Sequence, residues 1–91
     1  MALAFAFSPA SMNAKQYDEC IRQLAAAGAG APAGRLYHAC YGDGDKLRVF
    51  DIWESKEHFD RFGEILKPIL ERLGVDPGQP DVQTVHRVIK G

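Results

Sequence analysis

The stretch Gly42-Asp43-Gly44-Asp45 stands between two apolar runs and constrains the fold more than any other part of the chain. An Asp-Gly pair between apolar segments is the strongest short-range signal for a β-hairpin. Residues 35–41 and 46–53 are therefore expected to form two neighbouring antiparallel strands. Any fold proposed for this chain has to contain this hairpin.

Helical patterns lie on both sides of the hairpin. Asn13 is placed to begin the first helix, with Gln16 three residues later as in a capping box, and Gly28 to end it. Ser55 is placed to cap the second helix, which Gly74 stops. The hairpin is thus expected to sit between two amphipathic helices.

Two further strands complete the pattern, at residues 3–7 and 82–89. The order β-α-β-β-α-β over a single domain, residues 1–91, is the α+β, ferredoxin-like arrangement. It predicts a four-stranded antiparallel sheet with both helices on one face. Because Pro68 lacks an amide hydrogen, we expect a kink or break in the second helix near Lys67.

This arrangement leaves one face of the sheet without cover. In the third strand Phe50 and Ile52 lie on one face, while Leu47, Val49 and Trp53 lie on the other. Both faces are apolar, so both should be buried. A chain of this size buries only about 60% of its unfolded surface, and a second copy is the simplest cover for the other face. We therefore expect a homodimer through the sheet face.

Composition excludes several classes of protein. The net charge is −1, with 11 basic and 12 acidic residues and no basic run, so no nucleic-acid partner is expected. No apolar run approaches the length of a membrane span, and the short N-terminal apolar run lacks the preceding Lys or Arg of a signal peptide. Cys20 and Cys40 are too few for a disulfide framework, which favours a cytoplasmic protein with two thiols.

The hairpin brings His38 close to Asp51. A two-residue loop at Asp43-Gly44 places Leu36 opposite Asp51. His38 and Asp51 are then diagonal neighbours on one face, roughly 7–8 Å apart. A carboxylate beside a histidine fixes the tautomer of the ring and stabilises its protonated form, which is how a general base is built.

Purely structural roles for the same residues stay open. Asp51 can instead accept a hydrogen bond from a loop amide or pair with an arginine, and His38 can be a satisfied core histidine. Trp53 can be plain core. The face of His86 in the last strand depends on a register that the sequence does not fix.

The passage from the third strand into the second helix carries a family resemblance. Trp53-Glu54-Ser55-Lys56-Glu57, together with the βαββαβ order over nearly all of the chain, resembles the dimeric α/β-barrel superfamily. It looks most like the antibiotic-biosynthesis-monooxygenase group, where a W-x-S step often closes this strand. The resemblance implies two ferredoxin-like subunits, each with a pocket between sheet and helices that Trp53 lines. The superfamily includes cofactor-free quinone-forming monooxygenases, haem-degrading monooxygenases and muconolactone-type isomerases.

The same resemblance argues against haem. The haem-degrading branch places a ligand histidine about two turns beyond this tryptophan, where residues 60–64 here contain none. His58 lies a turn too early, and haem binding through His58 or His86 is the weakest hypothesis. No HxxxH, HxH, GxGxxG or P-loop spacing occurs either, so we expect no metal and no cofactor.

The sequence leaves three functions open. The first is a cofactor-independent monooxygenase for a small apolar, aromatic or polyketide-like molecule, with His38 and Asp51 as catalytic residues. Substrate contacts are then expected from a set of apolar and aromatic side chains with one histidine: Trp53, Leu36, Phe59, Phe62 and His86. The second is a non-catalytic ligand-binding or structural dimer, which a solidly packed interior would favour and a cavity of roughly 300 Å³ or more would disfavour. The third is an isomerase that uses the same base.

Overall fold

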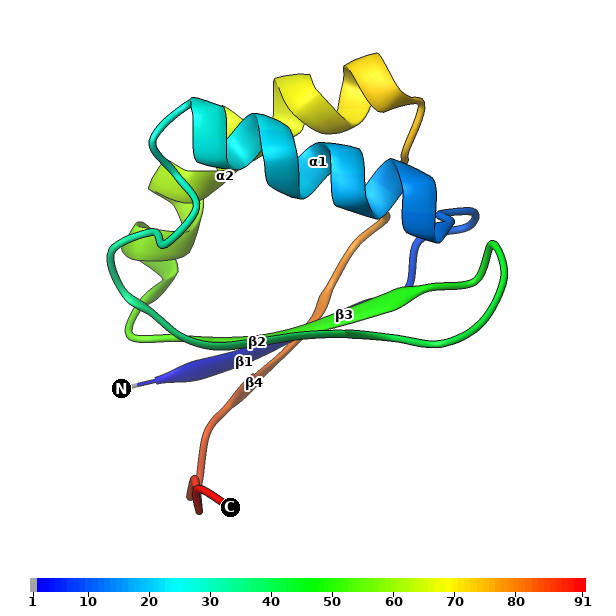
Figure 1. Cartoon of the computed structure of the whole chain (residues 1–91). Helices are drawn as coiled ribbons and strands as arrows, with labels where there is room; N and C mark the ends of the chain where they lie inside the picture. The colour runs from blue at the N-terminus through cyan, green and yellow to red at the C-terminus, as the bar shows by residue number, and fades with distance from the viewer. Residues whose placement is uncertain (1) are drawn as a thin grey trace.

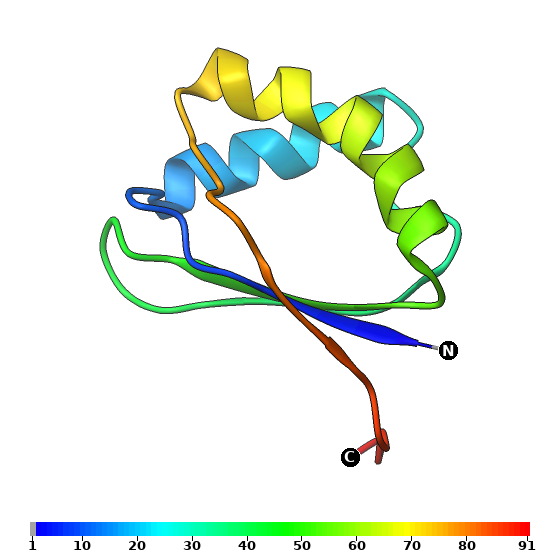
Figure 2. The same cartoon turned by 180° about the vertical axis from the view of Figure 1, so that it is seen from behind.

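The computed structural model describes residues 2–91 and has the predicted βαββαβ order, with four strands and two helices. The elements are β1 (Leu3–Phe7), α1 (Ala14–Ala26), β2 (Arg35–Tyr41), β3 (Arg48–Trp53), α2 (Lys56–Leu73) and β4 (Asp81–Thr84). The strands form one antiparallel sheet in the order β2-β3-β1-β4. Both helices cover the same face of this sheet (Figures 1 and 2). The predicted ferredoxin-like fold is confirmed.

The register of the hairpin differs from the prediction by two residues. Cys40 pairs with Val49 and His38 pairs with Asp51. The reason lies outside the hairpin, in the chain that follows β1. The amide of Met12 donates to the carbonyl of Asp45, at 2.7 Å, and the amide of Leu47 donates to the carbonyl of Met12, at 3.1 Å. The residues just before β3 are thereby taken out of the hairpin ladder, and the connection becomes longer than two residues.

From Tyr37 onward, a shift of two residues keeps the side chains of the hairpin on their predicted faces, because the side-chain period of a strand is two. His38 and Asp51 are therefore still on the same face, and they stand directly opposite each other instead of diagonally. The carboxylate comes closer to the imidazole than the sequence predicts.

A β-bulge at Leu36 changes the start of β2. Tyr37 pairs with Ile52, yet Arg35 pairs with Trp53, so Leu36 is the extra residue. The bulge resets the alternation of side chains, and Arg35 lies over the ring of Phe62 on the helix side of the sheet. Leu36 is 55% exposed. The prediction that Leu36 lines a pocket is wrong, because the bulge leaves its side chain exposed.

The helices begin and end where their caps predict. The Asn13 side chain accepts from the amide of Gln16, and the Gln16 side chain accepts from the amide of Asn13. Ser55 caps α2, and Gly74 ends it in the left-handed conformation. Helix α2 continues through Pro68 without a break, and it bends along its length (Figures 1 and 2). Neither helix between residues 2 and 91 is long and apolar enough to cross a bilayer.

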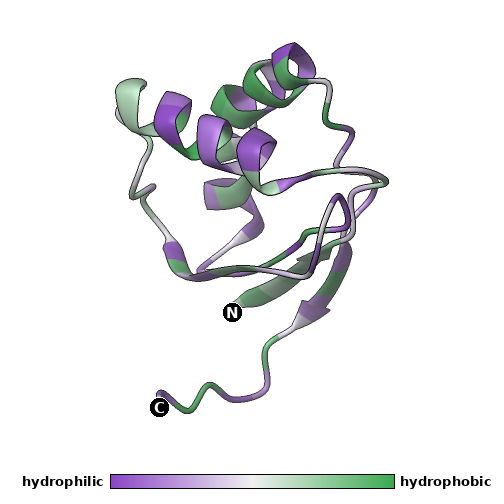
Figure 3. Cartoon of the chain, turned by 45° about the vertical axis from the view of Figure 1, so that its right-hand side comes forward, coloured by the Kyte–Doolittle hydropathy of each residue, from purple (hydrophilic) through white to green (hydrophobic). Residues whose placement is uncertain are grey.

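The core lies between the sheet and the two helices. Phe5 and Trp53 contribute from the sheet, Leu24 from α1, and Phe62 and Ile69 from α2. Along both helices apolar and polar segments alternate, as an amphipathic helix requires (Figure 3). Within residues 2–91 no helix covers the opposite face of the sheet (Figures 1 and 2).

Strand β4 is shorter than predicted. It ends at Thr84, and residues 85–91 form no strand. The last backbone contact to the sheet is the Val85 amide, which donates to the carbonyl of Ala2 at 3.0 Å. The chain then leaves the body of the domain (Figures 1 and 2), and His86 is exposed. The strand stops where β1, with which it pairs, begins at Leu3.

Candidate functional site

A cavity of about 390 Å³ lies between the helix-covered face of the sheet and the two helices. Its wall comes from β1, α1, β2, β3, α2 and the loop that leads to β4. Most of the lining is apolar, with Phe7, Met12 and Leu66 among its members. A largely apolar cavity of this size is a typical site for a small organic ligand. The interior is therefore not solidly packed.

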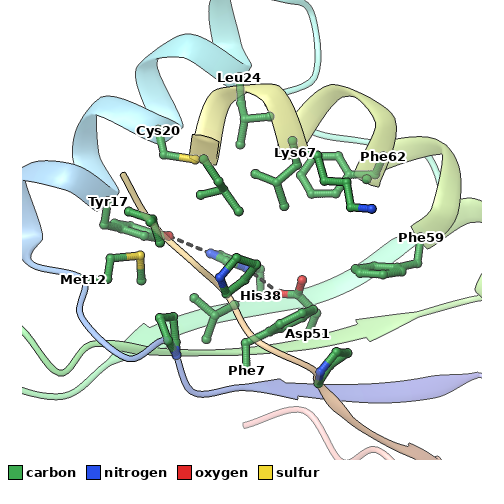
Figure 4. Close-up of a pocket in the computed structure, with 18 of the residues that line it drawn as sticks. Phe7, Met12, Tyr17, Cys20, Leu24, His38, Asp51, Phe59, Phe62 and Lys67 are labelled. Atoms are coloured by element: carbon green, nitrogen blue, oxygen red, sulfur yellow. Dashed lines mark hydrogen bonds and ion pairs between the residues drawn. The ribbon is translucent and has the colours of Figure 1, made fainter. Parts of the chain in front are cut away.

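A hydrogen-bonded chain of side chains contributes polar groups to the wall on the sheet side (Figure 4). The hydroxyl oxygen of Tyr17 lies 2.6 Å from Nε2 of His38. Nδ1 of the same ring lies 2.5 Å from Oδ1 of Asp51. Nε1 of Trp53 then donates to Oδ2 of Asp51 at 3.3 Å. Helix α1 and strands β2 and β3 thus meet at a single histidine.

The position of Asp51 fixes the protonation pattern of this chain. Asp51 is only 4% exposed, and an ionised carboxylate at this depth needs hydrogen-bond donors. His38 therefore carries a proton on Nδ1 and donates it to the carboxylate. In the neutral ring Nε2 is then an acceptor, and the Tyr17 hydroxyl donates to it. Along these hydrogen bonds a proton can therefore move from the Tyr17 hydroxyl to Nε2 of His38.

Burial determines the acidity of the tyrosine at the end of this chain. The loss of water around Tyr17, with a smaller effect from neighbouring Cys40, raises the pKa of the phenol to about 12. The guanidinium of Arg35 acts in the opposite direction and stabilises the phenolate. Tyr17 is consequently a neutral hydrogen-bond donor around neutral pH.

The predicted aromatic residues of α2 lie at the cavity. Phe59 and Phe62 both line it. The ring of Phe59 stacks on that of Phe5, with centroids 4.3 Å apart, which fixes one wall. His38 and Asp51 line the same cavity from the sheet side (Figure 4). Four of the residues singled out from the sequence are thus brought together.

Three other predicted residues lie elsewhere. Trp53 is 0% exposed and packs behind the wall against Phe59 and Phe62, so it holds Asp51 and has no surface for a ligand. Leu36 is exposed at the bulge, and His86 is exposed beyond the end of β4. Neither lines the cavity.

Tyr17 and Arg35 are polar residues of the cavity that are not among the predicted site residues. Tyr17 fits the apolar period of α1, although a tyrosine on such a stripe carries a hydroxyl that needs a partner. Strict alternation along β2 puts Arg35 on the outer face, and the bulge breaks that alternation. Both now line the cavity. A sequence signal existed for Tyr17, in its polar tip, and none existed for Arg35.

The remaining histidine lies at the start of α2. Oγ of Ser55 is 2.7 Å from Nδ1 of His58, and the ring borders a separate hollow of about 220 Å³. His58 therefore does not share the cavity that His38 and Asp51 line. Among residues 2–91 no three His, Cys, Asp or Glu side chains are grouped so that they could hold a metal ion.

Comparison with known proteins gives a structural likeness. No protein-family model matches the chain, and no curated protein sequence matches it. Among solved structures, the chain is similar to SnoaB, a cofactor-independent oxygenase from Streptomyces nogalater, with a TM-score of 0.61 and 16% sequence identity. The match covers 99% of this chain and 96% of that one. At this identity the likeness establishes the fold, and the chain has the ferredoxin-like fold of that oxygenase, in agreement with the group that the sequence resembles.

Proposed function

We propose that the protein is a monooxygenase that needs no cofactor and acts on a small aromatic or polyketide-like molecule bound in the cavity. The observation that carries the proposal is the hydrogen-bonded pair of His38 and Asp51 in the wall of a largely apolar cavity. A neutral imidazole oriented by a buried carboxylate is a general base. The fold shared with a cofactor-independent oxygenase supports the same reaction class.

The reaction begins with loss of a proton. An activated CH₂ group or phenol loses a proton that ends on His38, and Asp51 stabilises the imidazolium that forms. The electron pair stays on the substrate as a delocalised anion. This anion adds to O₂ and takes the proton back as a hydroperoxide, which loses water. In sum, one CH₂ group and one O₂ give one C=O group and one water.

The apolar body of such a substrate fits the lining. Phe59 and Phe62 offer aromatic surfaces on one side of the cavity. Arg35 lines the cavity and its charge acts on Tyr17, so it stabilises an anion at this end. The guanidinium makes one long hydrogen bond, of 3.3 Å to the carbonyl of Gly30. It is therefore available to a substrate anion.

We further propose that two copies associate through the face of the sheet that the helices leave bare. Tyr37 is 52% exposed there, and its ring meets the edge of Phe50, with centroids 6.2 Å apart. Ile52 belongs to the same face and not to the core between sheet and helices. Aromatic side chains of this kind are enriched in protein interfaces.

The test is oxygen consumption. Purified protein is given a panel of anthrones, phenols and unsaturated lactones, and O₂ uptake and products are followed. We expect uptake of one O₂ per quinone or ketone formed, and a fall of about a hundredfold or more in the His38→Ala variant. The matched control is His86→Ala, because His86 lies outside the cavity.

The alternatives give different results in the same assay. Conversion of a lactone without O₂ uptake indicates an isomerase that uses the same base. Saturable binding without conversion of any compound indicates a ligand-binding protein. Turnover that survives in His38→Ala contradicts the proposed base.

A further inference from the structure

Both ring nitrogens of His38 are already engaged. Nδ1 faces Asp51 at 2.5 Å, and Nε2 faces the hydroxyl of Tyr17 at 2.6 Å. A histidine in this state has no lone pair directed at the open cavity. The hydroxyl of Tyr17 occupies the hydrogen-bonding position of Nε2, and Tyr17 itself lines the cavity.

We propose that Tyr17 is the catalytic residue that touches the substrate, and that it relays the substrate proton to His38. This inference rests on the proposed function, since it assigns the first proton transfer of that reaction. The substrate proton moves to the Tyr17 oxygen while the phenolic proton moves to Nε2 of His38. The substrate keeps its electron pair, Tyr17 ends neutral, and the imidazolium is paired with Asp51.

The local structure holds Tyr17 in this position. Its amide donates to the carbonyl of Asn13 at 3.0 Å, one turn after the capping box that starts α1. The planes of the Tyr17 and His38 rings differ by 5°, with centroids 6.0 Å apart. The two rings are therefore nearly parallel. For Nε2 of His38 to contact a substrate directly, its hydrogen bond to Tyr17 would have to break and the near-parallel arrangement of the two rings would have to change.

The charges around the phenol suit a relay. Arg35 and Cys40 face Tyr17 from β2, Asp51 from β3 and Cys20 from its own helix, while Glu64 and Lys67 of α2 line the same cavity. The strongest influence is burial, which keeps the phenol protonated. A phenol of this kind is no base by itself, and it accepts a proton only as it gives its own to His38. Arg35 opposes the burial effect and stabilises transient negative charge on the oxygen.

Removal of the hydroxyl separates a relay from a direct base. In Tyr17→Phe, Nε2 of His38 is left facing the cavity. A relay predicts that kcat falls by about a hundredfold with little change in KM, and that His38→Gln and the double variant fall to the same level. A direct His38 base predicts that Tyr17→Phe keeps or raises kcat, which would overturn the inference while leaving the proposed function intact. Tyr41→Phe is the matched control, since Tyr41 lies outside the cavity lining.

A binding measurement covers the case in which no compound is turned over. The affinity for 2-naphthol, followed by its fluorescence, is compared in the wild type, Tyr17→Phe and Tyr41→Phe. Contact between Tyr17 and the ligand hydroxyl predicts a loss of about threefold to tenfold in Tyr17→Phe alone. Equal affinities in all three proteins would overturn the contact. Far-UV circular dichroism and urea midpoints, which are expected to match, show that the variants are folded.

Discussion

Nε1 of Trp53 donates a hydrogen bond to Oδ2 of Asp51 at 3.3 Å, two residues back on the same strand and the same face. The tryptophan is 0% exposed. An indole N–H is a donor only, so Oδ2 has to stay an acceptor. The other oxygen, Oδ1, is left for His38. Trp53 thus determines which carboxylate oxygen of Asp51 the histidine contacts.

This constraint gives a prediction for Asp51→Asn. The amide oxygen has to face Trp53, so the NH₂ group faces His38 and donates to Nδ1. The imidazole proton then moves to Nε2, the wrong tautomer for accepting from Tyr17. We expect a fall in turnover of about a hundredfold or more with the fold retained. ¹⁵N chemical shifts of the His38 ring report the tautomer directly.

A surface variant provides the comparison for this change. Asp18→Asn alters an exposed carboxylate of α1, and turnover and the His38 ¹⁵N shifts are expected to stay those of the wild type. An unchanged tautomer in Asp51→Asn would show that Trp53 does not orient residue 51.

The raised pKa of Tyr17 predicts how stability changes in alkali. The phenol has a pKa of about 12 in the folded protein and near 10.0 in the unfolded chain. The folded state therefore holds this proton more tightly, and the stabilisation is complete below pH 10 and lost as pH rises toward 12. Urea unfolding of the wild type and Tyr17→Phe across this range is expected to show a steeper loss for the wild type. Parallel curves would contradict the shift.

The fold was predictable because its signals are local. Asn13, Ser55 and Gly74 set the ends of the helices by hydrogen bonds and backbone angles within a few residues of themselves. The period of apolar residues then assigned each helix and strand. The end of β4 was not predictable, because it depends on where β1 begins as its neighbour. The length of β4 is therefore set by its pairing with β1 and not by its own residue types.

The candidate site was only half predictable. His38 and Asp51 were placed on one face because the parity of a strand survives a shift of two residues. Their direct pairing depends on Met12, which binds the chain near Leu47 and lies far from it in sequence. Arg35 lines the cavity because of the bulge at Leu36, and no residue type in this segment predicts a bulge. Contacts between distant segments decide both features.

Gly34 gives a prediction about packing. Its φ is +86°, and a Cβ there would collide with the ring of His58. We expect Gly34→Ala to cost clearly more stability than Gly28→Ala, which has φ +78° and open space around it. The Gly28 variant should cost about 1–2 kcal/mol from backbone strain alone. Urea unfolding provides the comparison.

The double variant Gly34→Ala/His58→Ala tests the collision. It removes the ring atoms but keeps the Cβ of residue 58, which lies 2.6 Å from the added Cβ. Replacing Gly34 in the His58→Ala background should therefore cost less than in the wild type and still more than the Gly28 replacement. A Gly34 cost that is the same with and without the ring would contradict a steric origin.

The bare face of the sheet predicts an oligomeric state. Tyr37 lies on this face in the edge strand β2, against Phe50 and opposite Ile52. We expect a dimer at micromolar concentration in sedimentation velocity, and a monomer when Tyr37→Asp places a charge in the interface. Glu57→Lys, on the exposed start of α2, is the control and should leave the dimer unchanged. A wild-type monomer under these conditions would refute the interface.

Gly63 predicts how the cavity can be closed without damage to the fold. It lies in α2, lines the cavity, and has no atom within 4 Å of the place where a Cβ would stand. Gly63→Ala should raise stability by about 0.5–1 kcal/mol, because alanine favours the helix, and should leave most of the volume free. Gly63→Leu should fill part of the cavity and weaken 2-naphthol binding by about tenfold or more, with no loss of stability. Fluorescence titration and urea unfolding measure the two effects. If both variants bind as the wild type does, the ligand lies elsewhere, and the His38 chain is not the site of the reaction.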